Sequence, residues 1–205
     1  MGSQNSGEKN PLELLEQALK GGITHFQLRE KGYGALTGSA LLEFALQCQQ
    51  LCRRYSVPFI MYDHVELACN LDADGVHIGQ DDLDAWQVRK KIGDHKLLGV
   101  SVHSVKEART AIENGADYVG MGPVFKTSSK EDAKKPAGVK GILAVRAKFP
   151  DLPIVGIGGI ASNNAEQVWQ AGVSGIAVIS AITNAVDIDK EINALQMPSR
   201  EESRK

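Results

Sequence analysis

Seven short apolar runs alternate along the chain with longer amphipathic stretches. The runs cover residues 24–29, 59–63, 75–80, 97–101, 118–122, 154–158 and 175–180. Their apolar residues are nearly continuous rather than alternating with polar ones, which is typical of parallel strands buried on both faces. The pattern therefore predicts a parallel sheet of at least seven strands.

The stretches between the runs have the periodicity of helices. Apolar residues recur there at intervals of three and four over residues 38–55, 104–114, 140–149 and 163–171, and a further helix is expected to begin near Pro11. Strands that alternate with helices form right-handed βαβ units. This number of units in 205 residues favours an α/β fold, a (β/α)₈ TIM barrel.

One strand of an eight-stranded barrel has no counterpart in the sequence. Residues 1–10 contain no apolar run that could form a buried strand. We therefore expect a polar N-terminal remnant at 1–10, a single barrel domain at 11–196 and a frayed tail at 197–205. The favoured hypothesis is that Met1 belongs to the end of the missing strand, through an early truncation or a misassigned start. A cloning remnant is the alternative, and a missing strand would leave two strand edges unpaired.

Composition narrows the classes of partner. The chain is 42% hydrophobic but has no apolar run of membrane-spanning length. Its formal net charge of -2 gives no basic field for nucleic acid or an anionic membrane, so we expect neither as a partner. The N-terminus does not resemble a signal peptide, and the three cysteines are expected to be small buried hydrophobic residues. These features predict a cytoplasmic protein and leave its oligomeric state open.

Charged side chains lie at the ends of the first three expected strands. The planar guanidinium of Arg29 and the ammonium of Lys31 both suit phosphate oxygens, although a salt-bridged rim explains them equally well. Asp63 and Asp82 follow the next two strands. Two carboxylates could hold Mg²⁺, which also takes water and substrate phosphate as ligands, but helix capping is another common use of aspartate.

The later strands end in features suited to phosphate. Three consecutive hydroxyl side chains lie between Lys126 and Lys130, in a loop that could close over a charged substrate or could be a solvated connection. Gly158 and Gly159 end the next strand, where backbone amides of such barrels commonly bind phosphate. The plainer interpretation is that these glycines ease packing.

Taken together, the motifs resemble the thiamine-phosphate synthase family, also called thiamine-phosphate pyrophosphorylase. The resemblance runs from about Pro11 to Ala181 and rests on segments 27–31, 72–82, 99–101, 115–118, 122–125, 127–130 and 156–159, in the family's order. It implies a transferase of thiamine biosynthesis with Mg²⁺ as cofactor. The expected reaction couples hydroxymethylpyrimidine diphosphate with hydroxyethylthiazole phosphate, both small phosphorylated molecules, giving thiamine phosphate and pyrophosphate.

The resemblance also implies a role for individual residues. Asp63 and Asp82 would ligate Mg²⁺, and Arg29, Lys31 and Lys130 would be catalytic by stabilising the departing charge. The pyrimidine diphosphate would be bound by Gln27, Leu28, Arg29, Glu30, Lys31, Tyr62, Ser101 and Lys130. The thiazole phosphate would be bound by Thr127, Ser128, Ser129, Gly159, Ile179 and Ser180. The bond to pyrophosphate would break first, and the thiazole nitrogen would capture the pyrimidine methylene cation, so positioning and electrostatics carry catalysis.

The two residues on either side of Asp63 depart from the family pattern. Tyr62 stands where the family usually has asparagine, immediately before the first metal-binding aspartate, and His64 stands where arginine or an acidic residue is common. A phenol projects further than an amide. We therefore expect Tyr62 to crowd the pyrimidine diphosphate pocket and limit activity, and Tyr62→Asn to raise kcat/KM.

Other functions stay open at this point. Thiazole tautomerases resemble the synthases and carry a Ser-Val-His segment like 101–103, in which His103 could move a proton. A catalytically impaired paralogue would only bind thiazole phosphate or thiamine phosphate. A general phosphate-binding isomerase explains the glycines but not the two aspartates. His25 and His77 are expected inside strands, as satisfied histidines rather than ligands.

Overall fold

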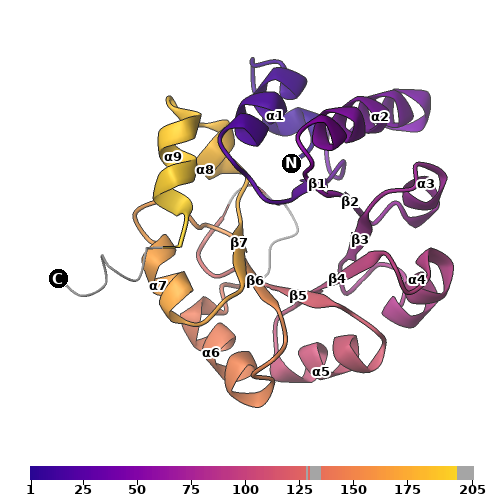
Figure 1. Cartoon of the computed structure of the whole chain (residues 1–205). Helices are drawn as coiled ribbons and strands as arrows, with labels where there is room; N and C mark the ends of the chain where they lie inside the picture. The colour runs from indigo at the N-terminus through magenta and orange to yellow at the C-terminus, as the bar shows by residue number, and fades with distance from the viewer. Residues whose placement is uncertain (128, 130–134, 198–205) are drawn as a thin grey trace.

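Seven parallel strands form a curved sheet with the helices around its outside (Figure 1). The computed structural model describes residues 1–127, 129 and 135–197. In these ranges the strands follow one another in sequence order, each paired parallel to the next: β1 (Phe26–Leu28), β2 (Phe59–Tyr62), β3 (Gly75–Ile78), β4 (Leu97–Val102), β5 (Tyr118–Met121), β6 (Ile154–Ile157) and β7 (Gly175–Ala177). The predicted α/β barrel, with seven of its strands recognisable in the sequence, is confirmed.

A helix follows each strand, as the periodicity predicts. The helices are α1 (Pro11–Lys20), α2 (Gly38–Arg54), α3 (Val65–Asn70), α4 (Ala85–Ile92), α5 (Val105–Glu113), α6 (Gly138–Lys148), α7 (Ala165–Gln170), α8 (Ser180–Thr183) and α9 (Ile188–Leu195), preceded by a short 3₁₀ helix, η1 (Ser3–Asn5). Helix α1 begins at Pro11 because Asn10 caps it, accepting hydrogen bonds from the amides of Leu12 and Glu13. Its start is therefore where the sequence predicts it.

The main hydrophobic core lies between the strands and the helices. Val76 and Ile78 of β3 are 1% exposed and pack in this layer, as do Leu98 and Val102 of β4. The residues between them, such as His77, face the inside of the barrel because successive side chains of a strand point to opposite faces. The inward positions of these two strands thus include polar side chains such as His77, while their outward positions carry the apolar burial.

The N-terminal segment is attached to β1. The amino group of Met1 donates a hydrogen bond to the carbonyl of Gln27 at 2.7 Å, and the Met1 carbonyl accepts one from the amide of Arg29 at 3.0 Å. Met1 thus makes the two backbone hydrogen bonds that one residue of a parallel neighbouring strand would make. The Ser3 hydroxyl and amide also bind the carboxylate of Glu30, which anchors η1.

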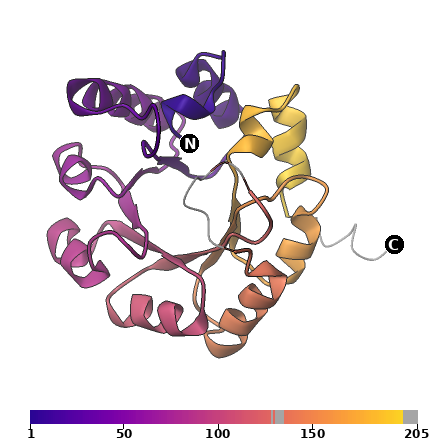
Figure 2. The ribbon, with the colours of Figure 1, turned by 180° about the vertical axis from the view of Figure 1, so that it is seen from behind.

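Helices cover the seam between β7 and β1. Helices α1 and α9 lie side by side there, in both views of the ribbon (Figures 1 and 2). A small apolar cluster joins them: Leu14, Ala18, Ile188 and Ile192. The ammonium of Lys9 adds hydrogen bonds to the carbonyls of Thr183 and Ala185, at 3.2 and 3.1 Å. Packing and polar contacts therefore hold the two ends of the sheet together although β1 and β7 are not paired.

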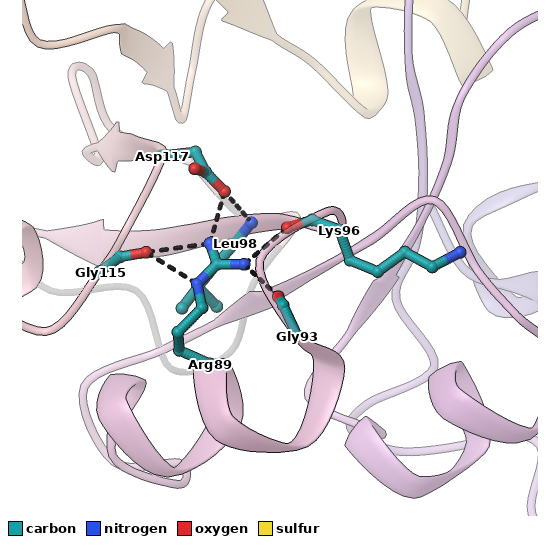
Figure 3. Close-up of polar contacts among 6 residues, drawn as sticks. All are labelled: Arg89, Gly93, Lys96, Leu98, Gly115 and Asp117. Atoms are coloured by element: carbon teal, nitrogen blue, oxygen red, sulfur yellow. Dashed lines mark hydrogen bonds and ion pairs between the residues drawn. The ribbon is translucent and has the colours of Figure 1, made fainter.

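An arginine braces the end of the barrel where the strands begin (Figure 3). The guanidinium of Arg89 lies 2.6 Å from the carboxylate of Asp117 and donates to the carbonyls of Gly93, Lys96 and Gly115. The same carboxylate accepts the amide of Leu98 at 2.7 Å. Asp117 directly precedes β5 and Leu98 is the second residue of β4, so this network fixes the beginnings of two strands.

Two expectations about individual side chains are wrong. His25 precedes β1 and is exposed, because the strand begins one residue later. Cys69 is exposed at the end of α3, whereas Cys48 and Cys52 are buried as expected. His77 does lie within a strand and is buried. Within the described ranges, no helix is both long and apolar enough to cross a membrane.

Candidate active site

The carboxyl ends of β1, β2 and β3 bring together one cation and two carboxylates. The ammonium nitrogen of Lys31 lies 3.0 Å from Oδ2 of Asp63 and 2.8 Å from Oδ1 of Asp82. The structure thus brings the cation next to the two candidate metal ligands. A positive charge already bridges both carboxylates in this arrangement.

Contacts with the backbone at the strand ends orient the carboxylates of Asp63 and Asp82. Asp63 has a left-handed backbone, with φ of 66°, and its amide donates to the carbonyl of His77 at 2.9 Å. This conformation costs a non-glycine residue about 1–3 kcal/mol, and such strain is often found at functional sites. Asp82 is held by a different contact, because its Oδ2 accepts the amide of Gly79 at 2.7 Å.

Opposite charges keep Lys31 and Asp82 ionised. Burial disfavours the Asp82 carboxylate, but hydrogen bonds from Lys31 and Gly79 outweigh it and hold the pKa of Asp82 below its ordinary value. Burial likewise disfavours the Lys31 ammonium, but hydrogen bonds to Asp82 and Asp63 raise the Lys31 pKa above its ordinary value. The two carboxylates thus lie next to one ammonium, and the Arg29 guanidinium over the neighbouring Tyr62 ring adds a second positive charge.

The two carboxylates suit Mg²⁺ by their chemistry. Hard carboxylate oxygens are its preferred protein ligands, and one or two of them are sufficient when water and substrate phosphate complete the coordination. Within the described residues, no group of three histidine, cysteine, aspartate or glutamate side chains could hold a metal. The residues therefore fit a metal shared with a phosphate ligand better than a metal held by protein alone.

The aromatic ring of Tyr62 lies against the basic side chains of Arg29 and Lys31. Its side chain is buried, with the guanidinium carbon of Arg29 at 5.2 Å and the Lys31 ammonium at 5.5 Å from the ring centroid. Such contacts of cations with aromatic rings are favourable. Its hydroxyl reaches toward Gly79, where an added Cβ would lie only 2.9 Å from the phenol oxygen. Glycine at position 79 thus leaves room for the Tyr62 hydroxyl.

Other members of the first motif serve the scaffold. Leu28 is 1% exposed and packs in the outer core. The buried Glu30 carboxylate accepts the amide of Leu36 at 2.9 Å in addition to its bonds with Ser3. Gln27 contributes its carbonyl to the contact with Met1. None of these three side chains lines the pocket beside Lys31, so the substrate-binding roles expected of them stay predictions.

A pocket opens beside the charged cluster. Its lining comes from the carboxyl ends of β1 to β6: Lys31, Tyr62, Gly79, Gln80, Asp81, Asp82, Ser101, His103, Gly120, Gly122, Pro123, Thr127 and Ile157. Ser101 lies there as the sequence predicts, with its hydroxyl oxygen 2.9 Å from Nε2 of His77. His103 also reaches the pocket, but its Nδ1 is 2.9 Å from the carboxylate of Glu107.

A second pocket adjoins the first at the ends of β6 and β7. It is lined by Thr127, Ser129, Ile157, Gly158, Gly159, Ile160, Ala177, Val178, Ile179 and Ser180. Five residues expected to bind the thiazole phosphate are thereby brought together: Thr127, Ser129, Gly159, Ile179 and Ser180. Thr127 and Ile157 line both pockets. Ser128 and Lys130 lie outside the described residues.

The glycines at the end of β6 have a packing role. Gly158 and Gly159 have positive φ angles of 95° and 67°. An added Cβ would lie 2.6 Å from Cβ of Pro123 at the first position and 2.8 Å from Cβ of Phe125 at the second. Glycine therefore allows the loop after β5 to approach the second pocket, which places Thr127 between the two pockets.

The sequence-based site list omits several pocket residues. Gln80 donates from its side-chain amide to the carbonyl of Ser101 at 2.7 Å and lines the first pocket. Gly120 and Gly122 also line it. Tyr118 is absent from the list too, although its hydroxyl lies 3.1 Å from Nδ1 of His77. For the residues of β4 and β5, the signal in the sequence is the alternation along these strands, in which the inward-facing positions include glycine. These glycines leave space for a large neighbouring side chain.

Comparisons with known proteins agree with this arrangement. The family model described as thiamine monophosphate synthase matches residues 1–182. The thiamine-phosphate synthase of Bacillus mycoides (strain KBAB4) is 57% identical over 185 residues, which cover 90% of this chain and 84% of that protein. That of Lysinibacillus sphaericus (strain C3-41) is 52% identical over 200 residues, covering 98% of this chain and 93% of that protein.

Solved structures give the same result. The thiamine phosphate pyrophosphorylase from Pyrococcus furiosus superimposes with a TM-score of 0.83 at 36% identity, covering 95% of this chain and 90% of that one. A 3-hexulose-6-phosphate synthase aligns with a TM-score of 0.66 at 16% identity, which shows a shared fold only. The match over most of the length, with the charged cluster and the two pockets, shows that the chain belongs to the thiamine monophosphate synthase family.

Proposed function

We propose that this chain joins hydroxymethylpyrimidine diphosphate to hydroxyethylthiazole phosphate, releasing pyrophosphate and forming thiamine phosphate. The observation that carries the proposal is the pair of adjoining pockets with Thr127 and Ile157 in common. The first pocket has the charged side chains that a diphosphate requires, and the second has hydroxyls and glycine backbone suited to a single phosphate. Two phosphorylated substrates can therefore meet at one mouth.

The charges of the first pocket suit a leaving pyrophosphate. When the carbon–oxygen bond of the pyrimidine diphosphate breaks, the electron pair leaves with the pyrophosphate oxygen and a methylene cation remains. The Lys31 ammonium lies at this pocket, and Arg29 lies beside it over the Tyr62 ring. Preorganised positive charge stabilises the departing oxygen without reorganisation during the reaction.

The thiazole phosphate bound at the second pocket is the nucleophile. The thiazole nitrogen donates its lone pair to the methylene cation, which forms the new carbon–nitrogen bond and completes the electron balance. Thr127, between the two pockets, is placed to contact both substrates. Holding two reactants in contact is a large source of rate enhancement, and no covalent nucleophile of the protein is required.

Asp63 and Asp82 would hold Mg²⁺ in this reaction. The bound ion would neutralise part of the diphosphate charge, which weakens the bond to the leaving group. The proximity of the two carboxylates and their hydrogen bonds to a cation, Lys31, support this assignment. Lys31 would then balance the carboxylates and meet the phosphate oxygens.

Incubation with both substrates and Mg²⁺ tests the proposed function. We expect thiamine phosphate and pyrophosphate to form in equal amounts, and neither to form when one substrate is omitted. A tautomerase would instead convert a thiazole phosphate isomer incubated alone, without pyrophosphate release. A chain that binds thiazole phosphate or thiamine phosphate in calorimetry but forms no product would be an impaired paralogue, and either result would refute the proposal.

A further inference from the structure

A chain of three hydrogen-bonding side chains crosses the inside of the barrel behind the first pocket. The Tyr118 hydroxyl lies 3.1 Å from Nδ1 of His77, and Nε2 of His77 lies 2.9 Å from the hydroxyl oxygen of Ser101. They come from three neighbouring strands, β5, β3 and β4. Only Ser101 lines the pocket, so the other two act on a substrate through it.

The barrel interior is shaped around these three hydrogen-bonded side chains. On β4, a Cβ added to Gly99 would collide with the Tyr118 ring and with Nδ1 of His77. On β5, a Cβ added to Gly120 would lie 2.9 Å from Cε1 of His77. Both inward positions therefore have to be glycine for the imidazole to reach Ser101.

Aromatic rings hold the imidazole on two sides. The Tyr62 ring stacks on His77, with centroids 5.8 Å apart and an interplanar angle of 20°. The Tyr118 ring lies at 5.5 Å and 46°. His77 is 6% exposed, so its ring has little freedom to turn. The orientation of its two nitrogens is consequently fixed.

The two hydrogen bonds of His77, to Tyr118 and to Ser101, can run in either of two directions. A neutral imidazole carries one proton, on Nδ1 or on Nε2. With the proton on Nδ1, His77 would donate to Tyr118 and accept the hydroxyl proton of Ser101. With the proton on Nε2, His77 would accept from Tyr118 and donate to Ser101, which leaves the serine proton available to the pocket.

The surroundings of Tyr118 favour the second direction. Within the described ranges, His77 is the hydrogen-bond partner recorded for the Tyr118 hydroxyl. If His77 donated to it, the proton of this half-buried phenol would have no acceptor recorded there, and a donor left unpaired away from water is costly. Burial also raises the pKa of Tyr118, with the Asp117 charge adding to the effect, so the phenol keeps its proton to donate.

We propose that Tyr118 and His77 are positioning residues that make Ser101 a hydrogen-bond donor toward the pyrimidine diphosphate pocket. Ser101 would then meet an acceptor of the substrate, a phosphate oxygen or a ring nitrogen, and would not accept from an amino group. This inference rests on the proposed function for the identity of the substrate. The direction of the hydrogen bonds rests on the protein alone.

Nitrogen NMR of the wild-type chain tests the direction without any turnover. With ¹⁵N-labelled histidine, and with the His77→Gln variant to assign the signals, we expect His77 Nε2 to be protonated and Nδ1 to be unprotonated. Protonation of Nδ1, alone or together with Nε2, would overturn the proposal. A wild-type chain that forms no thiamine phosphate would refute the proposed function, while this measurement would still decide the direction.

Tyr118→Phe tests the effect on the substrate. The ring is kept and one hydroxyl is lost, so we expect KM for the pyrimidine diphosphate to rise about ten-fold, as for the loss of roughly one hydrogen bond. We expect KM for the thiazole phosphate to stay unchanged. Tyr55→Phe is the matched control, because that hydroxyl binds Glu16 outside the barrel interior. Equal increases in both KM values would indicate general distortion and contradict the proposal.

A double-mutant cycle separates a positioning role from an independent one. If Tyr118 acts through Ser101, Tyr118→Phe should cause no further loss in a Ser101→Ala background. Additive losses in the double variant would show that Tyr118 acts by another route and would overturn the proposal.

Discussion

Lys31 and Asp82 are 51 residues apart in the sequence, yet the Lys31 ammonium lies 2.8 Å from Oδ1 of Asp82. The aspartate side chain is 6% exposed and the lysine side chain 38% exposed. The carboxylate is thus nearly enclosed, while its cationic partner faces the pocket. Both side chains line the first pocket, so the positive charge and its counter-charge lie together at the wall of that pocket.

Asp82→Asn should reduce kcat strongly. The amide oxygen can still accept the Gly79 amide, so the turn is kept, but the negative charge that would hold Mg²⁺ and balance Lys31 is lost. We expect a decrease of about 10²–10³-fold, similar to the loss of one transition-state stabilising group. Steady-state kinetics measure it, with exposed Asp94→Asn as the control. Equal activity of both variants would exclude Asp82 from the reaction.

Tyr62→Asn should separate activity from stability. The sequence-based expectation that this change raises kcat/KM stays a prediction. The structure adds a cost, because the variant loses a buried ring that packs on His77, and we expect the free energy of unfolding to fall by about 2–4 kcal/mol. Denaturant unfolding and kinetics on the same preparation test both effects. Tyr62→Phe keeps the ring and should show neither the gain nor the full loss.

Arg89→Ala should destabilise the fold without changing the pocket. The guanidinium joins Asp117 to three carbonyls at the entrances of β4 and β5 (Figure 3). We expect the free energy of unfolding to fall by about 2–3 kcal/mol, because hydrogen bonds to charged groups are strong and several are lost together. Arg54→Ala is the control, because its side chain is 65% exposed. Equal destabilisation in the two variants would argue against a stabilising role for the hydrogen bonds of Arg89.

The three cysteines should differ in reactivity. Burial raises the pKa of Cys52 to about 12, with the Asp74 charge adding to the effect, and burial also raises the pKa of Cys48. Because the thiolate is the reactive form, both thiols stay protonated and inert at pH 8. Mass spectrometry after iodoacetamide treatment should show modification at exposed Cys69 alone, and at all three after unfolding. Labelling of Cys52 in the folded protein would contradict its burial.

The sequence predicts the strands well because their apolar runs are short and bounded. The start of β1 is less well defined, since Thr24 and His25 have no feature that excludes them from the strand. The convergence of Lys31, Asp63 and Asp82 follows from parallel strands ending at one edge. The hydrogen-bond distances within this cluster, and the directions in which the pKa values of Lys31 and Asp82 shift, depend on tertiary packing. The sequence alone does not predict them.

The parts of the site that the sequence does not predict depend on contacts between strands. Glu30 looks like a pocket residue beside Arg29 and Lys31, but its carboxylate binds Ser3 and the Leu36 amide. The relation of Tyr118 to His77 depends on the register of β3, β4 and β5, which brings Gly99 beside both residues. A one-residue shift in register would turn these side chains to the other face.

The decisive measurement is the rate of pyrophosphate release as a function of Mg²⁺ concentration with both substrates present. We expect a saturable increase in the wild-type chain, loss of release with excess chelator, and little response to Mg²⁺ in Asp82→Asn. Pyrophosphate release at the full wild-type rate in excess chelator would contradict the role assigned to Asp63, Asp82 and Lys31.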